Sequence, residues 1–144
     1  MVKNIKILFT VLFLAGCFFV PSFAFAHQPR LVYLQPSLVN INSPELSQAF
    51  FDELKGAPRD YFITSDKDFK LYINLLVPEL ANLNGRYSAN VYLMSGENED
   101  KIATLDGASS DWSPFFEDYG RDYYLKGPEL TRDVLAGKYK IEVF

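Results

Sequence analysis

The stretch that decides the fold is FKLYINLLV, at residues 69–77. Large apolar side chains occupy its odd positions, and Lys70, Tyr72 and Asn74 stand between them. A period of two residues predicts a strand with one buried face. The pattern ends at Pro78, because proline has no backbone N–H to donate to a neighbouring strand.

Working outward from this stretch, several other short segments alternate in the same way. Gly, Pro, Asn and Asp separate them, which is typical of tight turns. The segments cover residues 30–34, 39–42, 60–64, 87–94, 101–105 and 138–144. The pattern predicts one all-β domain, a single antiparallel β-sandwich of jelly-roll or immunoglobulin-like type.

Two segments carry helical signals instead. Residues 44–54 fit a helix, because Ser43 suits an N-cap, Pro44 the first helical position and Gly56 the C-terminal cap. The same residues also alternate as a strand, so both alternatives stay open at this point. Residues 128–135 are expected to form one helical turn.

The N-terminus has the three-part pattern of a secretory signal peptide. Lys3 and Lys6 supply positive charge, and a mostly apolar segment follows at residues 7–20. That segment is shorter than the ~20 residues that a membrane-spanning helix needs. Ala24-Phe25-Ala26 then places small residues at the two positions that a signal peptidase recognises, so we expect cleavage after Ala26.

Cleavage there divides the chain into a signal peptide, residues 1–26, and an exported domain, residues 27–144, in the periplasm or the extracellular space.

The alternative is a lipobox, LAGC, which ends at Cys17. Lipidation of Cys17 would anchor the protein to a membrane. It would also leave the apolar residues after Cys17 in water, at a cost of about 1.5–3 kcal/mol for each large side chain. We therefore favour release.

The composition limits the partners. The formal net charge is −4, and removal of Lys3 and Lys6 makes it more negative. An acidic surface argues against nucleic acid and against anionic lipid, so we expect membrane contact only if Cys17 is lipidated. The single histidine, His27, allows no Ser–His or Cys–His pair, and we expect neither enzymatic activity nor a cofactor.

Four segments occur in an order that resembles a known family: DYFI at 60–63, FKLYI at 69–73, ANVYL at 89–93 and LAGKYKIEV at 135–143. They resemble the bacterial pre-peptidase C-terminal domains and uncharacterised exported bacterial proteins of similar layout. The resemblance implies a jelly-roll-like β-sandwich with an accessory, non-catalytic role. It also implies that residues 48–54 form a strand.

In that family, the strand that matches residues 138–144 is followed by a turn and a further strand. The resemblance therefore implies either a domain truncated at its C-terminus or one that closes differently. Without the further strand, residues 138–144 would form an unpaired edge. Such an edge can accept a strand from another chain.

Residues 108–127 combine aromatic and acidic side chains. Trp112, Tyr119, Tyr123 and Tyr124 are the candidate ligand-binding residues of this segment, because flat rings beside acidic acceptors suit sugars. The alternative is that Trp112, Phe115 and Phe116 pack into one end of the sandwich, since large aromatic side chains are usually buried.

Asp66 and Asp68 form a weaker candidate, a calcium site completed by Asp60. Calcium takes about 6–8 oxygen ligands, and a D-x-D pair is frequent in solvated turns, so a simple turn is the alternative. His27 would be the first mature residue, but a copper site there would need a second histidine.

These observations predict an exported, non-catalytic binding or accessory domain with a protein or glycan partner. The first alternative is a carbohydrate-binding module that uses the aromatic loop from Trp112 to Tyr124. The second is a small secreted hydrolase, which needs two facing carboxylates. Its candidates are Asp111, Glu117, Asp118 and Asp122.

Overall fold

The structure is a computed structural model that describes residues 28–33, 38–80, 85–118 and 120–144. Within these residues the chain forms ten strands and no helix, which confirms the all-β class. The expected signal peptide, with Cys17 and Ala26, lies outside the described residues. So do His27 and Tyr119.

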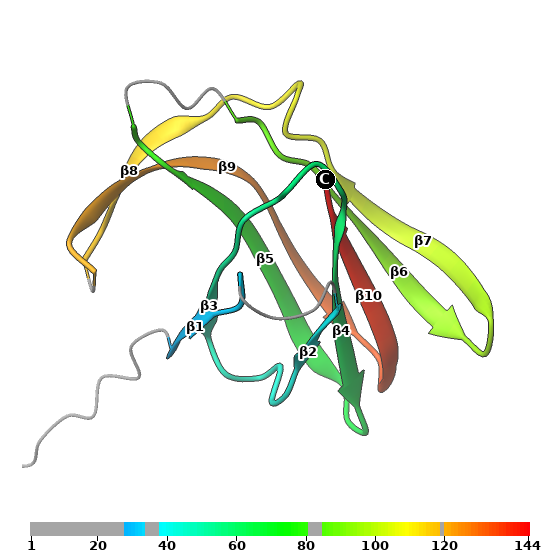
Figure 1. The fold of residues 1–144 in the computed structure, drawn as a ribbon. Helices are drawn as coiled ribbons and strands as arrows, with labels where there is room; N and C mark the ends of the chain where they lie inside the picture. The colour runs from blue at the N-terminus through cyan, green and yellow to red at the C-terminus, as the bar shows by residue number, and fades with distance from the viewer. Residues whose placement is uncertain (1–27, 34–37, 81–84, 119) are drawn as a thin grey trace, which may run out of the picture.

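The larger sheet has five strands in the order β2-β4-β10-β6-β7 (Figure 1). These strands are β2 (Leu38–Ile41), β4 (Arg59–Ser65), β10 (Gly137–Val143), β6 (Ala89–Ser95) and β7 (Asn98–Leu105). The alternation predicted from the sequence is visible in their burial. Tyr61, Ile63 and Ile141 are buried, whereas Thr64, which follows Ile63 in β4, is exposed.

β10 lies in the middle of this sheet, antiparallel to β4 on one side and to β6 on the other. The prediction of an unpaired edge at residues 138–144 is therefore wrong. The register sets Ile141 between Tyr61 of β4 and Val91 of β6, all three in the core. The backbone of a strand with buried side chains is itself removed from water, so its N–H and C=O groups need hydrogen-bond partners. A central position provides such partners on both edges of the strand.

The second sheet is antiparallel, with the order β5-β9-β8. It consists of β5 (Phe69–Pro78), β9 (Asp122–Val134) and β8 (Ser113–Glu117). A small third sheet pairs β1 (Gln28–Leu31) with β3 (Gln48–Phe51).

The prediction of wholly antiparallel sheets is wrong at two places, because β1 pairs with β3 and β2 pairs with β4 in parallel. The first strands alternate between sheets: β2, which follows β1 in the chain, belongs to the five-stranded sheet, and β3 returns to β1. Neighbours in space are thus not neighbours in sequence here. Strands joined by a crossover can pair in parallel, whereas a tight hairpin cannot.

β3 decides the ambiguous segment in favour of a strand at Gln48–Phe51. The expected helix start does not form. Leu46 N donates to Ser43 O, and Ser43 takes a φ of 57°, which places it in a turn. The strand that the resemblance implied for residues 48–54 is confirmed over its first half.

The helical turn expected at residues 128–135 is wrong, because β9 runs through this segment. Pairing with β8 reaches only as far as Lys126, and the register with β5 shifts between Asn74 and Leu76. Pro128 therefore lies at an irregularity, beyond the end of β8. A strand tolerates a proline at a position where no neighbouring strand requires a backbone N–H as a hydrogen-bond donor.

The core lies between the five-stranded sheet and the three-stranded sheet, which face each other in Figure 1. Val91 of β6 is fully buried, and Leu71 of β5 is nearly so. The rings of Phe69 and Tyr139 meet edge to face across the two sheets, with their centroids 5.7 Å apart. This layered arrangement is compatible with a β-sandwich.

A buried polar cluster attaches the β1–β3 pair to β4. Arg59 Nε lies 2.7 Å from Asp52 Oδ2, and the two side chains are only 11% and 10% exposed. Tyr61 donates its hydroxyl to Asp52 Oδ2 at 2.7 Å, and Arg59 Nη2 donates to Val32 O at 2.7 Å. Val32 directly follows β1 and Asp52 directly follows β3, so both strands of this parallel pair reach the cluster at their C-terminal ends.

Candidate functional site: the aromatic hairpin

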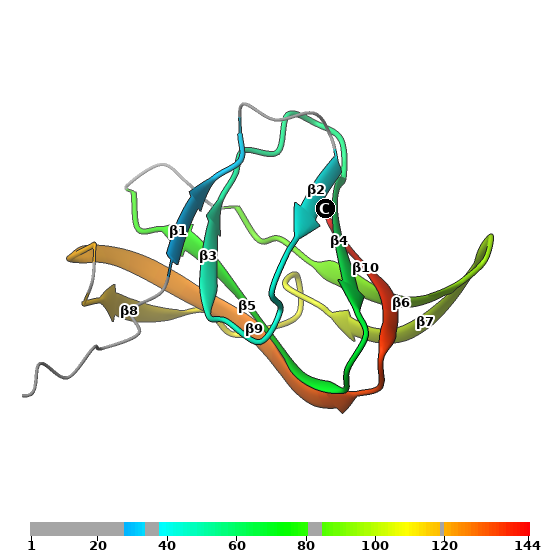
Figure 2. The same ribbon diagram turned by 90° about the horizontal axis from the view of Figure 1, so that it is seen from below.

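β8 and the first half of β9 form a hairpin that extends away from the five-stranded sheet (Figures 1 and 2). The segment expected to be an aromatic loop is thus regular structure for most of its length. Glu117 pairs with Asp122 beside the turn, and the two rows above it are aromatic. These rows are Phe116 opposite Tyr123 and Phe115 opposite Tyr124.

Neighbouring residues of a strand point to opposite faces, so Tyr123 and Tyr124 cannot share a face. Tyr123 lies on the face of Val77, which is buried in the core, and we call this the inner face. Tyr124 lies on the other side with Pro78 and Phe115, and we call this the outer face.

The inner face of the hairpin presents an aromatic pair. The ring centroids of Phe116 and Tyr123 are 4.9 Å apart, with the planes tilted by 51°. Tyr123 is 64% exposed, the largest exposure of any described aromatic side chain, and Phe116 is 40% exposed. The hairpin leaves the core before this pair is reached, so no other sheet buries it.

The outer face combines two aromatic and two acidic side chains. Phe115 and Tyr124 stand directly opposite each other, and Glu117 and Asp122 form the next row on the same side. Burial raises the pKa of the Tyr124 hydroxyl, and the negative charges of Asp122 and Glu117 raise it further. Both carboxylates therefore lie within electrostatic reach of this ring.

Trp112 anchors the base of the hairpin. Its Nε1 donates to Gly107 O at 2.8 Å, and Arg86 lies 5.3 Å from the ring centroid. The ring also covers Gly127 of β9, where a Cβ would come within 2.5 Å of it. Trp112 thus packs against the sheet, whereas Phe115 and Phe116, which the same alternative placed at the end of the sandwich, are exposed on the hairpin.

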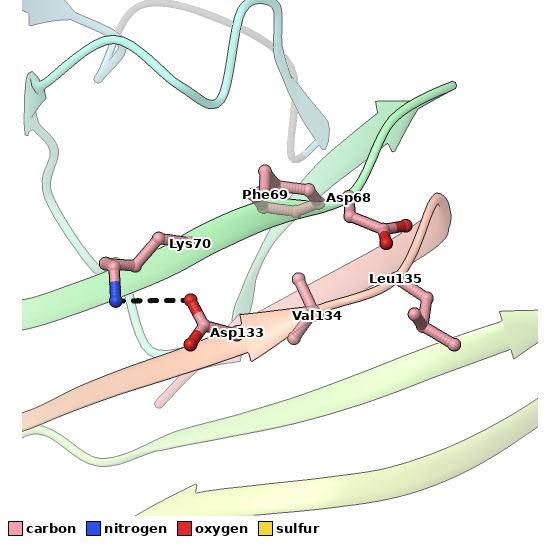
Figure 3. A pocket seen from close by; sticks show the side chains of 6 residues that line it. All are labelled: Asp68, Phe69, Lys70, Asp133, Val134 and Leu135. Atoms are coloured by element: carbon pink, nitrogen blue, oxygen red, sulfur yellow. Dashed lines mark ion pairs between the residues drawn. The ribbon is translucent and has the colours of Figure 1, made fainter.

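Asp66 and Asp68 lie in the turn between β4 and β5. Asp68 Oδ1 accepts from Ala136 N at 2.8 Å, which ties this turn to the one between β9 and β10. An open pocket of about 400 Å³ lies beside it, and its lining includes the ion pair between Lys70 and Asp133 at 3.1 Å (Figure 3). No group of three or more acidic, His or Cys residues is placed to hold a metal within the described part of the chain.

Asp60, the third residue of the calcium hypothesis, lies at the other end of β4, opposite Glu142. Burial raises the pKa of its carboxyl group, and Lys140 nearby acts in the opposite direction. The structure thus does not bring Asp60 to Asp66 and Asp68. Of the acidic residues considered for a hydrolase, it places Glu117 and Asp122 directly opposite each other.

Phe115 and Phe116 are the residues of this site that sequence reasoning missed, because it expected both to pack beside Trp112 and not to lie exposed. A usable signal was present, because Glu117 and Asp122 flank a short segment with Gly120, and a hairpin closed there brings Phe115 opposite Tyr124. The chain was expected to form a loop in this region, and residues of a loop have no cross-strand partners.

Comparisons of this chain with family models, with curated proteins and with solved structures give no match. No helix that is long and apolar enough to span a bilayer occurs in the part of the chain that the structure describes.

Proposed function

We propose that this chain is an exported, non-catalytic binding module that holds its partner at the β8–β9 hairpin. In this proposal the fold is a jelly-roll or immunoglobulin-like β-sandwich related to the bacterial pre-peptidase C-terminal domains. The signal peptide ends at Ala26, and the module acts in the cell envelope or the extracellular space. It binds its partner in that compartment and catalyses no reaction.

One observation supports this proposal most directly. The hairpin leaves the body of the molecule (Figure 2). It still carries exposed aromatic side chains on both faces. Aromatic side chains that add nothing to the core are costly in water, and contiguous exposed apolar surface marks interaction sites. The edge strands β7 and β8 offer less to a partner strand, because Pro114 removes an N–H from the short β8 and β7 carries the charges of Glu99, Asp100 and Lys101.

A second candidate is carbohydrate recognition at the inner face. The exposed ring of Tyr123 beside Phe116 offers a surface on which a sugar could stack. The hydrolase alternative has less support. Glu117 and Asp122 lie side by side on one open face, whereas a glycosidase places its carboxylates on opposite sides of a bond.

The test is sedimentation with cell envelopes from the native host. The protein is purified from that host, and its intact mass identifies the first residue, which we expect to be His27. The wild type should pellet with the envelopes, and the double variant Phe116→Ala with Tyr123→Ala should stay in solution. Tyr72→Ala is the control, because Tyr72 is also exposed but lies outside the hairpin.

Digestion of the envelopes with a protease or with a muralytic enzyme before mixing distinguishes a protein partner from a glycan. Equal pelleting of the wild type and the double variant would show that the hairpin is not the binding surface. If Tyr72→Ala pelleted as poorly as the double variant, this would also show that the hairpin is not the binding surface. Removal of any exposed ring would then reduce the binding.

A further inference from the structure

We infer that Asp60 is the proton-binding group of a pH-sensitive switch in the five-stranded sheet. In this inference the Asp60 carboxylate takes up one proton from solvent on acidification and donates it as a hydrogen bond to Glu142. That bond completes a row of hydrogen bonds across β7, β6, β10 and β4. The inference does not depend on the hairpin and goes beyond the proposed function.

The first step is the row itself. Its members stand directly opposite one another on four neighbouring strands: Asp60 of β4, Glu142 of β10, Asn90 of β6 and Thr104 of β7. Tyr61, the neighbour of Asp60 in β4, points into the core, so the row lies on the face of the sheet that is turned away from the core. Side chains directly opposite each other in adjacent strands are close enough to interact.

The second step is the direction of the hydrogen bonds in this row. Thr104 Oγ1 donates to Asn90 Oδ1 at 2.9 Å, and Asn90 Nδ2 donates to Glu142 Oε2 at 3.4 Å. The hydroxyl of Tyr92 donates to the same oxygen of Glu142 at 3.2 Å. The hydrogen bonds therefore run from β7 towards Glu142, and Asp60 is the next member of the row.

The third step is the unsatisfied oxygen of Asp60. Its Oδ1 is buried and has no hydrogen-bond partner among the residues that the structure describes. An ionised Asp60 can only accept hydrogen bonds, as can an ionised Glu142, and like charges directly opposite each other repel. A protonated Asp60 carries an O–H that can donate to Glu142. One proton thus supplies the missing donor and removes one of the two opposed charges.

The charged groups around Asp60 favour this proton. The pKa of the Asp60 carboxyl is raised, first by its burial. The positive charge of Lys140 lowers this pKa, whereas the negative charges of Glu142 and Glu99 raise it. Across the other edge of β4, the residue opposite Asp60 is the uncharged Leu38 of β2.

Lys140 is the one cation that acts on Asp60 in this way, and it has its own counter-ion. Its Nζ forms an ion pair with Glu99 and lies 4.5 Å from the ring centroid of Tyr92. Lys140 stands opposite Phe62, one row away from Asp60. Its charge is therefore directed to Glu99 and does not satisfy the buried oxygen of Asp60.

The sign of the pH response follows from the raised pKa. In the unfolded chain an aspartate titrates at about pH 3.9. The stability that Asp60 contributes is therefore complete below that pH and is lost as the pH rises through its raised folded value. Once Asp60 is ionised, it opposes Glu142 between the two strands. We expect this sheet to be held more tightly in mild acid than at neutral pH.

The first experiment titrates the exported protein and follows the carboxyl ¹³C resonance of Asp60 by NMR. We expect its midpoint to lie above about pH 3.9. The side-chain amide of Asn90 should shift with the same midpoint, because it donates to Glu142. The side-chain amide of Gln48 is the control, since it donates to Asn42 O and Ser43 O and should show no step there.

The second experiment compares urea unfolding of Asp60→Asn and the wild type from pH 4 to pH 8. An asparagine has an N–H donor for Glu142 at every pH. We expect the stability of the variant relative to the wild type to rise with pH, with a ratio of unfolding constants that changes by up to about tenfold per pH unit. Asp133→Asn removes an exposed carboxylate paired with Lys70 and is the matched control, for which we expect no such rise.

Two results would overturn the inference. One is an Asp60 resonance that titrates at or below about pH 3.9. The other is an Asp60→Asn variant that loses stability relative to the wild type as the pH rises, as expected if ionised Asp60 were a needed counter-ion of Lys140. The titration of the wild type decides between the two states of Asp60 even if the variant does not fold.

Discussion

Gly127 lies flat against the ring of Trp112, and this contact fixes where the hairpin leaves the sheet. A Cβ on Gly127 would lie 2.5 Å from Cη2 and 2.6 Å from Cζ2 of the ring. The ring has little room to withdraw, because its Nε1 is bonded to Gly107 O. It also lies only 3.1 Å from the place where a Cβ of Gly107 would stand.

We therefore expect Gly127→Ala to destabilise the protein by about 1–3 kcal/mol, the usual cost of an overpacked contact. Urea unfolding followed by the fluorescence of Trp112 measures this, since the chain has one tryptophan. Gly137→Ala is the control, because the nearest atom to its Cβ would be 3.6 Å away. Equal midpoints for the two variants would contradict the packing role of Trp112.

Tyr123 and Tyr124 show that a list of candidate residues does not say which of them share a surface. They are adjacent in sequence and equally aromatic, yet they belong to opposite faces of one strand. Tyr123 shares a surface with Phe116, and Tyr124 shares one with Phe115 and the acidic pair. One ligand therefore cannot stack on both rings at once.

Among the elements, the small β1–β3 sheet depends most on polar contacts. Most of its described residues are exposed or only partly buried, with Phe50 packed edge to face on Tyr61 at 5.6 Å. The ion pair between Asp52 and Arg59 adds the directional link to β4. A buried charge that keeps no partner is strongly unfavourable, so the two side chains depend on each other.

Asp52→Ala should lower the free energy of unfolding by about 3–5 kcal/mol, because it leaves Arg59 buried without its counter-ion. The neighbouring pair between Glu53 and Lys55 provides the control. Its side chains are 64% and 68% exposed, and Glu53→Ala should cost no more than about 1 kcal/mol. Chemical unfolding of both variants measures the two free energies. Similar losses in Asp52→Ala and Glu53→Ala would mean that the buried cluster stabilises the protein no more than an exposed ion pair does.

β8 and β9 were the elements hardest to predict. In β5 the alternation follows burial, because one face packs on the core and the other meets water. The hairpin has no buried face at its tip, so aromatic residues occur on both sides and no period appears. Pro128 added a helical signal that local propensity supports and the β-pairing overrides.

For the whole molecule, tyrosines set the response to alkaline pH. Burial raises the pKa of Tyr61, and the hydrogen bond to Asp52 raises it further. Burial also raises the pKa of Tyr72, Tyr92, Tyr124 and Tyr139. The folded state then holds these phenolic protons more tightly than the unfolded state, in which the pKa is about 10.

The stability that these groups contribute is complete below that unfolded value and is lost as the pH rises towards their raised values. We expect urea midpoints to be flat from about pH 8 to about pH 9.5 and to fall above about pH 10. Tyr61→Phe should start lower, since it loses a hydrogen bond, and should fall less steeply. A midpoint that rises above about pH 10 would contradict this sign.

The strands β4, β5, β6, β7 and β10 were predictable because each has one face in the core, and burial imposes a period of two on the sequence. Their order in the sheets was not. The place of β10 between β4 and β6 depends on partners far away in the sequence, such as Asn90 and Glu142, which are 52 residues apart. No local pattern records such a pairing.

The sequence by itself determined that the described chain is all-β and where most strands run, since hydrophobic periodicity and turn residues act over a few positions. The acidic balance and the aromatic segment at residues 108–127 are also evident from it. Only the tertiary structure decided which strands are parallel, that β10 is central, and that Phe115, Tyr124, Glu117 and Asp122 share one face. These depend on register and on long-range packing, in which a shift of one residue would turn every side chain of a strand to the other face.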